Sequence, residues 1–214
     1  TRLIMFEGKV KKLEMMASKL RAHSLMMTTI AGCGHPTSCL SCAEIMSVLF
    51  FSEIKRGDEF ILSKGHAAPI LWAAMAEAEA IDKLELKNLR KVDSILEGHP
   101  TPRAPGIKVA TGSLGQGLSA GVGMAIANNL NKNKGIIFVL LGDGECDEGS
   151  VWEAVSIAAH NKLNNLCAVV DVNQLGQSGE TIYGHSLEPY RKKFEASGWH
   201  VEMIYGHHVQ ELLD

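Results

Sequence analysis

The spacing of apolar residues predicts helices and strands that alternate along most of the chain. Between Val10 and Ile30 the apolar residues recur at near-helical spacing, which predicts a long amphipathic helix that ends at Gly32 and Gly34. Further helices are expected at Ala43–Phe51, Ala67–Ala80, Lys83–Leu89, Leu114–Asn131, Ser150–Asn161 and Pro189–Ala196. Short apolar runs predict strands at Glu59–Leu62, Ile136–Leu141, Leu166–Val172 and Trp199–Ile204. This alternation is typical of βαβ units and predicts an α/β fold, a parallel sheet with helices on both faces.

A glycine-rich and strongly acidic turn follows one of these strands, and it reads Gly142-Asp143-Gly144-Glu145-Cys146-Asp147-Glu148-Gly149. A strand that enters such a turn and then a helix commonly holds a phosphate. Here the acids would repel a bare pyrophosphate, unless a divalent cation reversed the sign of the site. Mg²⁺ prefers oxygen ligands, and Asp143 and Asn173 each lie just beyond the carboxyl end of a predicted strand. The pairing indicates a diphosphate held through a metal, although the Gly-Asp-Gly triplet alone is more typical of a tight surface turn.

Three histidines, His35, His66 and His99, each follow a glycine in a predicted loop. A loop at the end of an element places an imidazole where a ligand can reach it. Any one of them alone would more often be a surface or capping residue, and only the set favours a functional role.

Composition limits the classes of function. A chain of 214 residues with 46% hydrophobic and 21% charged residues fits one globular domain. The net charge of −3 gives no sign of a nucleic-acid or membrane-binding surface, so neither partner is expected. No apolar stretch approaches the roughly 18 residues needed to span a bilayer, and the first residues lack the core of a signal peptide, so the cytoplasm is the default expectation.

The five cysteines are an odd number and are expected to be free thiols. Cys39 and Cys42 form a C-x-x-C pair, but a structural zinc site would need a second pair of ligands at suitable spacing. We therefore interpret them as small buried helix residues.

Five motifs in this order resemble those of transketolases. They are Gly34-His35-Pro36-Thr37-Ser38, Leu62-Ser63-Lys64-Gly65-His66-Ala67-Ala68-Pro69, Ala110-Thr111-Gly112-Ser113-Leu114-Gly115-Gln116-Gly117-Leu118, Gly142-Asp143-Gly144-Glu145 and Asn173-Gln174-Leu175-Gly176-Gln177-Ser178. The resemblance extends over nearly the whole chain, residues 1–214. It implies the N-terminal, diphosphate-binding part of that family, with a thiamine diphosphate-binding fold that is incomplete at its C-terminus.

The resemblance also implies a role for individual residues. Asp143, Asn173 and the backbone carbonyl of Leu175 match ligands for Mg²⁺ or Ca²⁺, and Gly144 matches a backbone contact to the diphosphate. The other residues predicted to bind the cofactor are Ser38, Lys64, His66, Gly112, Ser113, Leu114, Glu145, Asn173 and Gln177, of which Lys64 and Gln177 match second-tier positions. His35, His66 and His99 match catalytic imidazoles that face the thiazolium and the hydroxyl groups of the sugar. Glu148 matches an acid at the subunit interface that links two active sites.

The implied reaction is the transfer of a two-carbon ketol unit from a ketose, or ketose phosphate, to an aldose. The family's activating glutamate belongs to a pyrimidine-binding domain that these residues do not include. A C-terminal subunit or domain is therefore an expected partner, in a homodimer or an α₂β₂ assembly. The sequence does not decide between a fragment of a longer chain and a split subunit, nor which sugars or sugar phosphates are substrates. The connection Ser52–Asp58 is also shorter than the family's usual loop.

Two other functions are compatible with parts of the pattern. A nucleotide-binding α/β enzyme would explain the strand, glycine turn and helix, but the acidic turn disfavours a dinucleotide site without metal. A catalytically silent or regulatory homologue would keep the fold, but it would have no physical need for Asp143, Asn173 and the three Gly-His turns.

Overall fold

The structure is a computed structural model that describes residues 2–176 and 179–214. Its internal contacts group into two compact units. The helical unit comprises Thr1–Ile54, His66–Ile107 and Ile204–Asp214, and the sheet unit comprises Lys55–Gly65 and Lys108–Met203. The expectation of a single domain over residues 1–214 stays a prediction.

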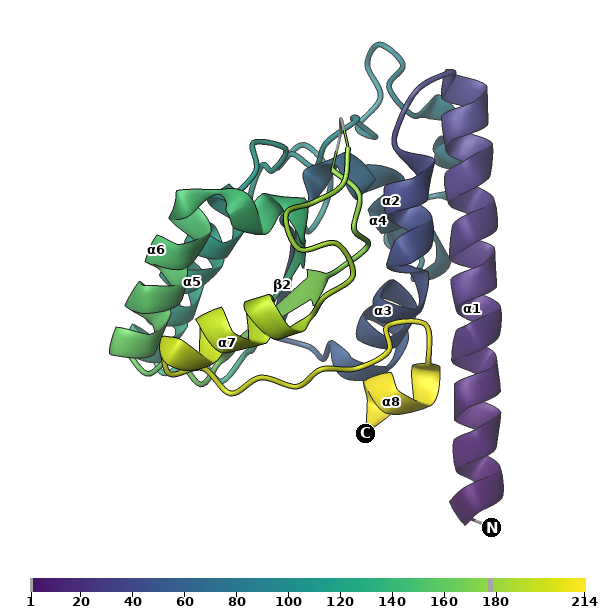
Figure 1. Cartoon of the computed structure of the whole chain (residues 1–214). Coiled ribbons are helices and arrows are strands. Elements are labelled where there is room, and N and C mark those ends of the chain that lie inside the picture. Colours follow the sequence, from purple (N-terminus) through teal and green to yellow (C-terminus); the bar gives the residue numbers. More distant parts are fainter. Residues whose placement is uncertain (1, 177–178) are drawn as a thin grey trace. The chain divides into compact units, whose positions relative to one another are not determined.

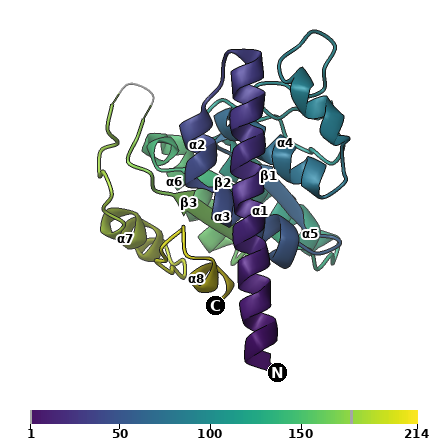
Figure 2. The same cartoon turned by 90° about the vertical axis from the view of Figure 1, so that its right-hand side faces the viewer.

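The helical unit is organised around one long helix, α1 (Arg2–Ala31), which extends further toward the N-terminus than predicted. It ends where the sequence predicts, because Gly32 and Gly34 adopt positive φ angles. The other helices of this unit are α2 (Pro36–Ser41), α3 (Ala43–Val48), α4 (Ala68–Glu77) and α8 (Val209–Leu213). Figures 1 and 2 show α2, α3 and α4 beside α1. Nearly all of α4 is buried, which explains why its sequence is apolar on all sides.

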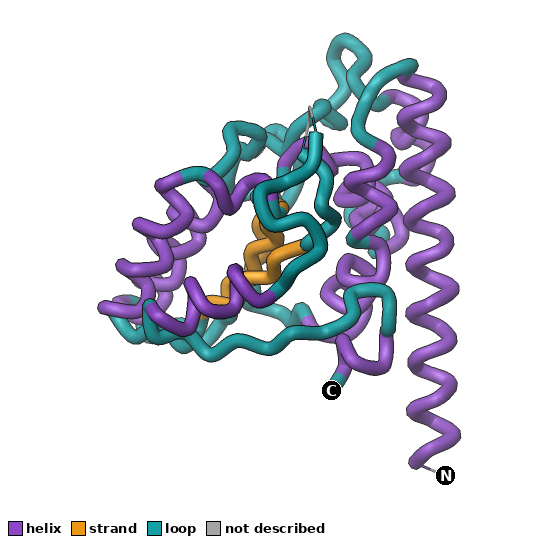
Figure 3. Tube along the Cα trace, viewed as in Figure 1, coloured by secondary structure: helices purple, strands orange, loops and turns teal. Residues whose placement is uncertain are grey.

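The sheet unit contains a parallel sheet with the strand order β1-β2-β3. Its strands are β1 (Glu59–Leu62), β2 (Ile137–Gly142) and β3 (Leu166–Asp171), and β2 lies in the middle (Figure 2). Its helices are α5 (Gln116–Leu130), α6 (Gly149–His160) and α7 (Glu188–Ala196). In the register of the sheet Leu62 pairs with Leu140, and Gly142 pairs with Asp171. Because the strands are parallel, the carboxyl ends of all three lie at one edge of the sheet. Figure 3 shows the strands in orange and the loops in teal.

The core of the sheet unit explains the small residues of α5. Ile137, Val139 and Leu141 alternate along β2 and pack with buried residues of α5, α6 and α7. A Cβ atom at Gly121 of α5 would lie only 2.7 Å from Cγ2 of Val139. The glycine thus allows the helix to approach its own sheet closely.

The predicted strand at Trp199–Ile204 is wrong, because the structure has no strand there. Its apolar residues have another explanation. Trp199 and Val201 pack against the core of the sheet unit, whereas His200 and Glu202 face solvent. A segment with one buried side gives the same period of two without pairing to a neighbouring strand. The predicted helix at Lys83–Leu89 is a 3₁₀ helix at Lys83–Asn88, and the short helices α2 and α8 were not predicted.

Two further predictions from the sequence concern the cysteines and membrane-spanning helices. All five cysteines are present as thiols, and Cys39 and Cys42 are buried, as expected for structural residues. Within residues 2–176 and 179–214, none of the helices combines the length and the apolar character that crossing a bilayer requires.

Candidate functional site

The carboxylate of Asp143 is the central group at the edge of the sheet. Asp143 follows β2 directly and is only 2% exposed. Its Oδ2 atom accepts hydrogen bonds from the backbone N–H of Gln174, at 2.8 Å, and from the hydroxyl of Thr181, at 3.0 Å. These donors come from the two arms of the loop after β3, which is closed by a 2.8 Å bond from the Thr181 N–H to the Gln174 carbonyl. The carboxylate therefore anchors this loop to the end of β2.

The same bonds bring the three predicted metal ligands into one small region. Gln174, whose N–H contacts Asp143, lies between Asn173 and Leu175 in the chain. The Oδ1 atom of Asn173 accepts a 3.0 Å bond from the N–H of Leu175, which orients the amide. Gln174 has φ of +62°, in the left-handed region, and this turns the chain sharply between the two predicted ligands. Gln177, predicted to contact the cofactor, lies outside the described residues.

The chemistry of these groups fits a hard divalent cation. A carboxylate, an amide oxygen and a backbone carbonyl are the ligands that Mg²⁺ and Ca²⁺ prefer. Burial raises the pKa of Asp143, and the nearby charge of Asp171 raises it further, while the hydrogen bonds act in the opposite direction. A bound cation would compensate this buried negative charge. Among the described residues no group of three or more His, Cys, Asp or Glu side chains could hold a metal, so the fit depends on the amide and carbonyl oxygens.

Glu145, predicted to bind the cofactor, has both carboxylate oxygens engaged within the protein. Oε1 accepts bonds from the Ser63 hydroxyl and the N–H of Gly115, and Oε2 accepts one from the N–H of Gly142. Burial raises the pKa of this carboxyl, and the three hydrogen bonds partly oppose the rise. Glu145 thus joins the ends of β1 and β2 to the start of α5, and its contact with a cofactor stays a prediction.

Lys64 forms a buried ion pair with Asp171 across the sheet. The ammonium of Lys64, just after β1, lies 2.5 Å from Oδ2 of Asp171, the last residue of β3. The side chains are 1% and 7% exposed. The backbone carbonyl of Asp171 also accepts the N–H of Asp143. Lys64 therefore compensates a carboxylate beside the predicted metal ligand and fixes the first and last strands relative to each other.

The predicted cofactor loop Gly112–Leu114 lies against the turn after β1. The hydroxyl of Thr111 donates a 2.7 Å bond to the Leu62 carbonyl, and a Cβ atom at Gly65 would lie 2.7 Å from the Gly112 nitrogen. Only glycine permits this approach. Ser113 and Leu114 remain exposed, at the same edge of the sheet unit as the strand ends.

The helical unit brings the three predicted imidazoles close together. His35 precedes α2, and its ring lies 5.2 Å from that of His66, centroid to centroid, in an edge-to-face arrangement. Burial lowers the pKa of His99, and the positive charge of Arg90 and the neighbouring His35 lower it further. The guanidinium of Arg90 lies against the backbone of Gly98. A Cβ atom placed at Gly98 would be only 3.1 Å from Nε of Arg90. His99 is therefore protonated less readily than an ordinary histidine.

Replacing Arg90 with glutamine should raise the pKa of His99 toward that of an ordinary histidine. The variant removes a positive charge that disfavours the imidazolium form, so protonation becomes easier. Titration of the His99 ring by NMR measures the change. Arg103→Gln is the matched control, because Arg103 is exposed and paired with Glu97. An unchanged His99 titration in the Arg90 variant would contradict the electrostatic coupling.

Two further predicted residues lie where they can contact other molecules. Ser38 is half-buried in α2, and Glu148 is exposed at the start of α6. Exposure of Glu148 is compatible with the predicted subunit interface, and both roles stay predictions.

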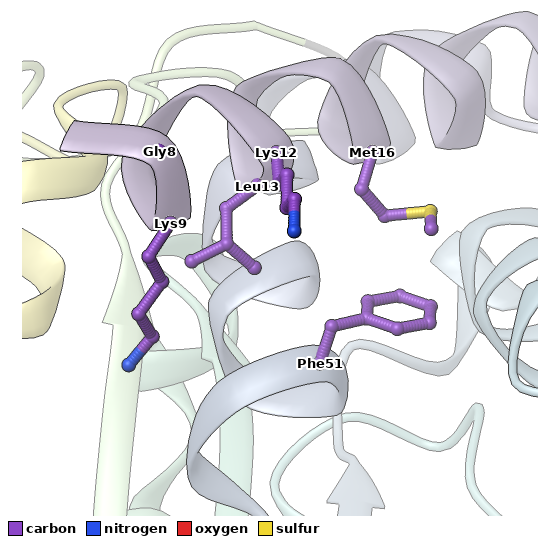
Figure 4. Close-up of a pocket in the computed structure, with 6 residues that line it drawn as sticks. All are labelled: Gly8, Lys9, Lys12, Leu13, Met16 and Phe51. Atoms are coloured by element: carbon purple, nitrogen blue, oxygen red, sulfur yellow. The ribbon is translucent and has the colours of Figure 1, made fainter. Parts of the chain in front are cut away.

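A surface pocket of the helical unit does not coincide with any predicted site residue. It is lined by Gly8, Lys9, Lys12, Leu13, Met16 and Phe51 (Figure 4). These residues belong to α1 and to the π-helical segment Leu49–Glu53, whereas the imidazoles lie in other segments of this unit. The pocket therefore does not support a second site for the cofactor.

Sequence reasoning missed Asp171 as a partner of Lys64, Thr181 as a partner of Asp143, and Arg90 as a neighbour of His99. The paired residues are separated by 107, 38 and 9 positions, so no local motif connects them. A signal for Asp171 was its place as a charged residue at the end of an apolar strand. Thr181 and Arg90 carry no comparable signal.

A parallel sheet with a buried carboxylate and a polar loop at its carboxyl edge places the chain among α/β proteins that bind a ligand at the ends of their strands. The family model described as "Transketolase, thiamine diphosphate binding domain" matches residues 13–213. The chain belongs to this family, as the resemblance predicts, and its fold is the thiamine diphosphate-binding α/β fold.

Individual relatives agree with this assignment. The chain is 51% identical to transketolase-like protein 2 of Bos taurus and 50% identical to transketolase of Homo sapiens, with 95% and 96% of this chain covered. It spans only 34% and 35% of those proteins. It is 38% identical to a subunit of apulose-4-phosphate transketolase from Phocaeicola vulgatus, covering 95% of this chain and 76% of that protein. A crystal structure of transketolase from Campylobacter jejuni matches with a TM-score of 0.87 and 32% identity, covering 95% of this chain and 34% of that one.

Proposed function

We propose that this chain binds thiamine diphosphate through Mg²⁺, or Ca²⁺, and takes part in transferring a two-carbon ketol unit from a ketose or its phosphate to an aldose or its phosphate. The observation that carries the proposal is the anchoring of the Asn173–Leu175 loop by Asp143. The bond from Gln174 to Asp143 ties the segment that carries Asn173 and Leu175 to the end of β2, which supports an all-oxygen metal site at the carboxyl edge of the sheet.

Each residue would have a separate task. Asp143, the amide oxygen of Asn173 and the carbonyl of Leu175 would hold the cation, and the backbone at Gly144 would contact the diphosphate. Ser38 and residues 112–114 would line the cofactor. The bound cofactor supplies the chemistry that breaks and forms the carbon–carbon bond. The protein's part is to bind, to orient and to transfer protons.

Proton transfer is assigned to His35, His66 and His99. The lowered pKa of His99 favours a neutral ring near pH 7, which can accept a proton from a sugar hydroxyl. The ring contact between His35 and His66 restrains both imidazoles and keeps their nitrogens within a small region.

A second polypeptide segment would complete the enzyme. The relative from Phocaeicola vulgatus is named as one subunit of a transketolase, which supports an arrangement with a separate partner subunit. The partner would be a C-terminal transketolase subunit or domain that carries the activating glutamate, in a homodimer or an α₂β₂ assembly. Glu148 would lie at the interface.

Calorimetric titration tests the proposal. Thiamine diphosphate is added to the protein with its C-terminal partner or domain, first with Mg²⁺ and then with excess chelator. We expect saturable binding with Mg²⁺ and its loss with chelator. Absence of binding under both conditions would favour a silent homologue, and binding unaffected by chelator would contradict the role of the metal.

A further inference from the structure

Thr181 holds the carboxylate of Asp143 from a position that no motif marks. Its hydroxyl donates to Oδ2 of Asp143 at 3.0 Å, and its backbone N–H donates to the Gln174 carbonyl at 2.8 Å. Gln174 in turn donates to the same Oδ2 atom. Thr181, Gln174 and Asp143 therefore form a closed set of three hydrogen bonds.

This closed set fixes one carboxylate oxygen of Asp143 by two donors. Both donors are geometrically constrained, since Gln174 contributes a backbone N–H and Thr181 is 8% exposed. These two donors, together with a backbone hydrogen bond from Gly144, restrain the orientation of the carboxylate. The backbone N–H of Thr181 bonds the carbonyl of Gln174, which lies between Asn173 and Leu175 in the chain. The hydroxyl that ties Thr181 to Asp143 therefore also links this segment to the carboxylate.

We propose that Thr181 is a positioning residue for the metal site, whose hydroxyl orients Asp143 and ties the loop that follows Asn173 to this carboxylate, so that the predicted ligand oxygens meet the octahedral demand of Mg²⁺. The inference rests on the proposed function and extends it to the choice of metal. Mg²⁺ requires near-ideal octahedral geometry, whereas Ca²⁺ accepts variable geometry and coordination number. Loss of the orienting hydroxyl should therefore weaken Mg²⁺ binding more than Ca²⁺ binding.

The test compares Thr181→Val with Thr181→Ser in the protein assembled with its C-terminal partner or domain. Valine keeps the shape and removes the hydroxyl, whereas serine keeps the hydroxyl. At a fixed concentration of thiamine diphosphate, calorimetry gives the half-saturating concentrations of Mg²⁺ and of Ca²⁺. Loss of a group that orients a metal ligand typically weakens metal binding about 10–100-fold. We expect a rise of this size for Mg²⁺ in Thr181→Val, a smaller rise for Ca²⁺, and values near wild type in Thr181→Ser.

Thr28→Val is the matched control. Thr28 is 8% exposed, like Thr181, and its hydroxyl donates to the Ser24 carbonyl within α1. The same substitution therefore removes one buried hydroxyl far along the chain from the predicted ligands. Its half-saturating metal concentrations should equal those of wild type.

The outcomes separate the inference from the proposed function. Wild-type protein that binds no thiamine diphosphate with either metal overturns both. Wild-type binding with an unchanged Thr181→Val variant, or with equal losses for Mg²⁺ and Ca²⁺, overturns only the role of Thr181. If Thr181→Val does not fold, Thr181→Cys replaces it, because a thiol is a much weaker donor than the hydroxyl of Thr181→Ser. The same difference between the two metals is then required.

Discussion

Replacing Asp143 with asparagine should abolish metal-dependent binding of thiamine diphosphate and leave the protein folded. The amide oxygen of asparagine can accept the bonds that Gln174 and Thr181 now donate to Oδ2. Its NH₂ group then takes the place of the other carboxylate oxygen, where it has no lone pair for a cation. Loss of a group that only orients a metal ligand weakens metal binding by up to about 100-fold. Because Asp143→Asn removes a ligand itself, we expect the half-saturating Mg²⁺ concentration to rise by more than this.

The same substitution should not lower the stability of the ligand-free protein. Burial raises the pKa of Asp143, so the ionised form is less favourable in the folded state than in the unfolded state. When the folded state raises the pKa of a carboxyl group, the protein becomes less stable as the pH rises through the folded pKa. At pH 7 the charge of such a group therefore opposes folding. The neutral amide removes that cost. Urea unfolding without ligands should therefore give a free energy at least equal to that of wild type.

Asp147→Asn is the control for this experiment. Asp147 belongs to the same acidic turn but is exposed, so its substitution changes the net charge equally without touching the carboxylate at the end of β2. Binding by Asp147→Asn should remain metal-dependent, with little change in affinity. Cofactor binding by Asp143→Asn at wild-type Mg²⁺ concentrations would contradict the assignment of Asp143 as a ligand.

Replacing Lys64 with methionine should strongly destabilise the sheet unit. Methionine fills a similar volume but leaves the buried carboxylate of Asp171 without its cation. Removing one partner of a buried ion pair costs about 3–5 kcal/mol. The free energy of unfolding, measured with urea, should fall by this amount.

A second substitution and a control identify the cause of the loss. Adding Asp171→Asn to Lys64→Met removes the uncompensated charge and should restore a large part of the stability. Lys192→Met removes an exposed lysine, 3.5 Å from Glu188, and should leave stability nearly unchanged. If Lys64→Met resembles Lys192→Met, or if the double variant is no more stable than Lys64→Met, the buried pair does not have the role we assign to it.

Much of the fold follows from local patterns. The strands at 59–62 and 166–171 and the helix α6 lie within one or two residues of their predicted bounds, because an apolar run bounded by glycines or polar residues specifies a buried strand or helix locally. The prediction of a strand at 199–204 failed because a pattern of apolar residues reports which side chains are buried. It does not report whether a neighbouring strand is available for hydrogen bonding.

The candidate site divides in the same way. The sequence by itself determined the family, the order of the motifs and the acidic turn, since these depend on residues adjacent in the chain. Only the tertiary structure decided that Thr181 and Gln174 share one oxygen of Asp143 and that Lys64 is paired with Asp171. It also decided that burial and the charge of Arg90 lower the pKa of His99. These contacts depend on strand register and loop closure, which bring together groups far apart in the sequence, and a local pattern of residue types carries no information about either.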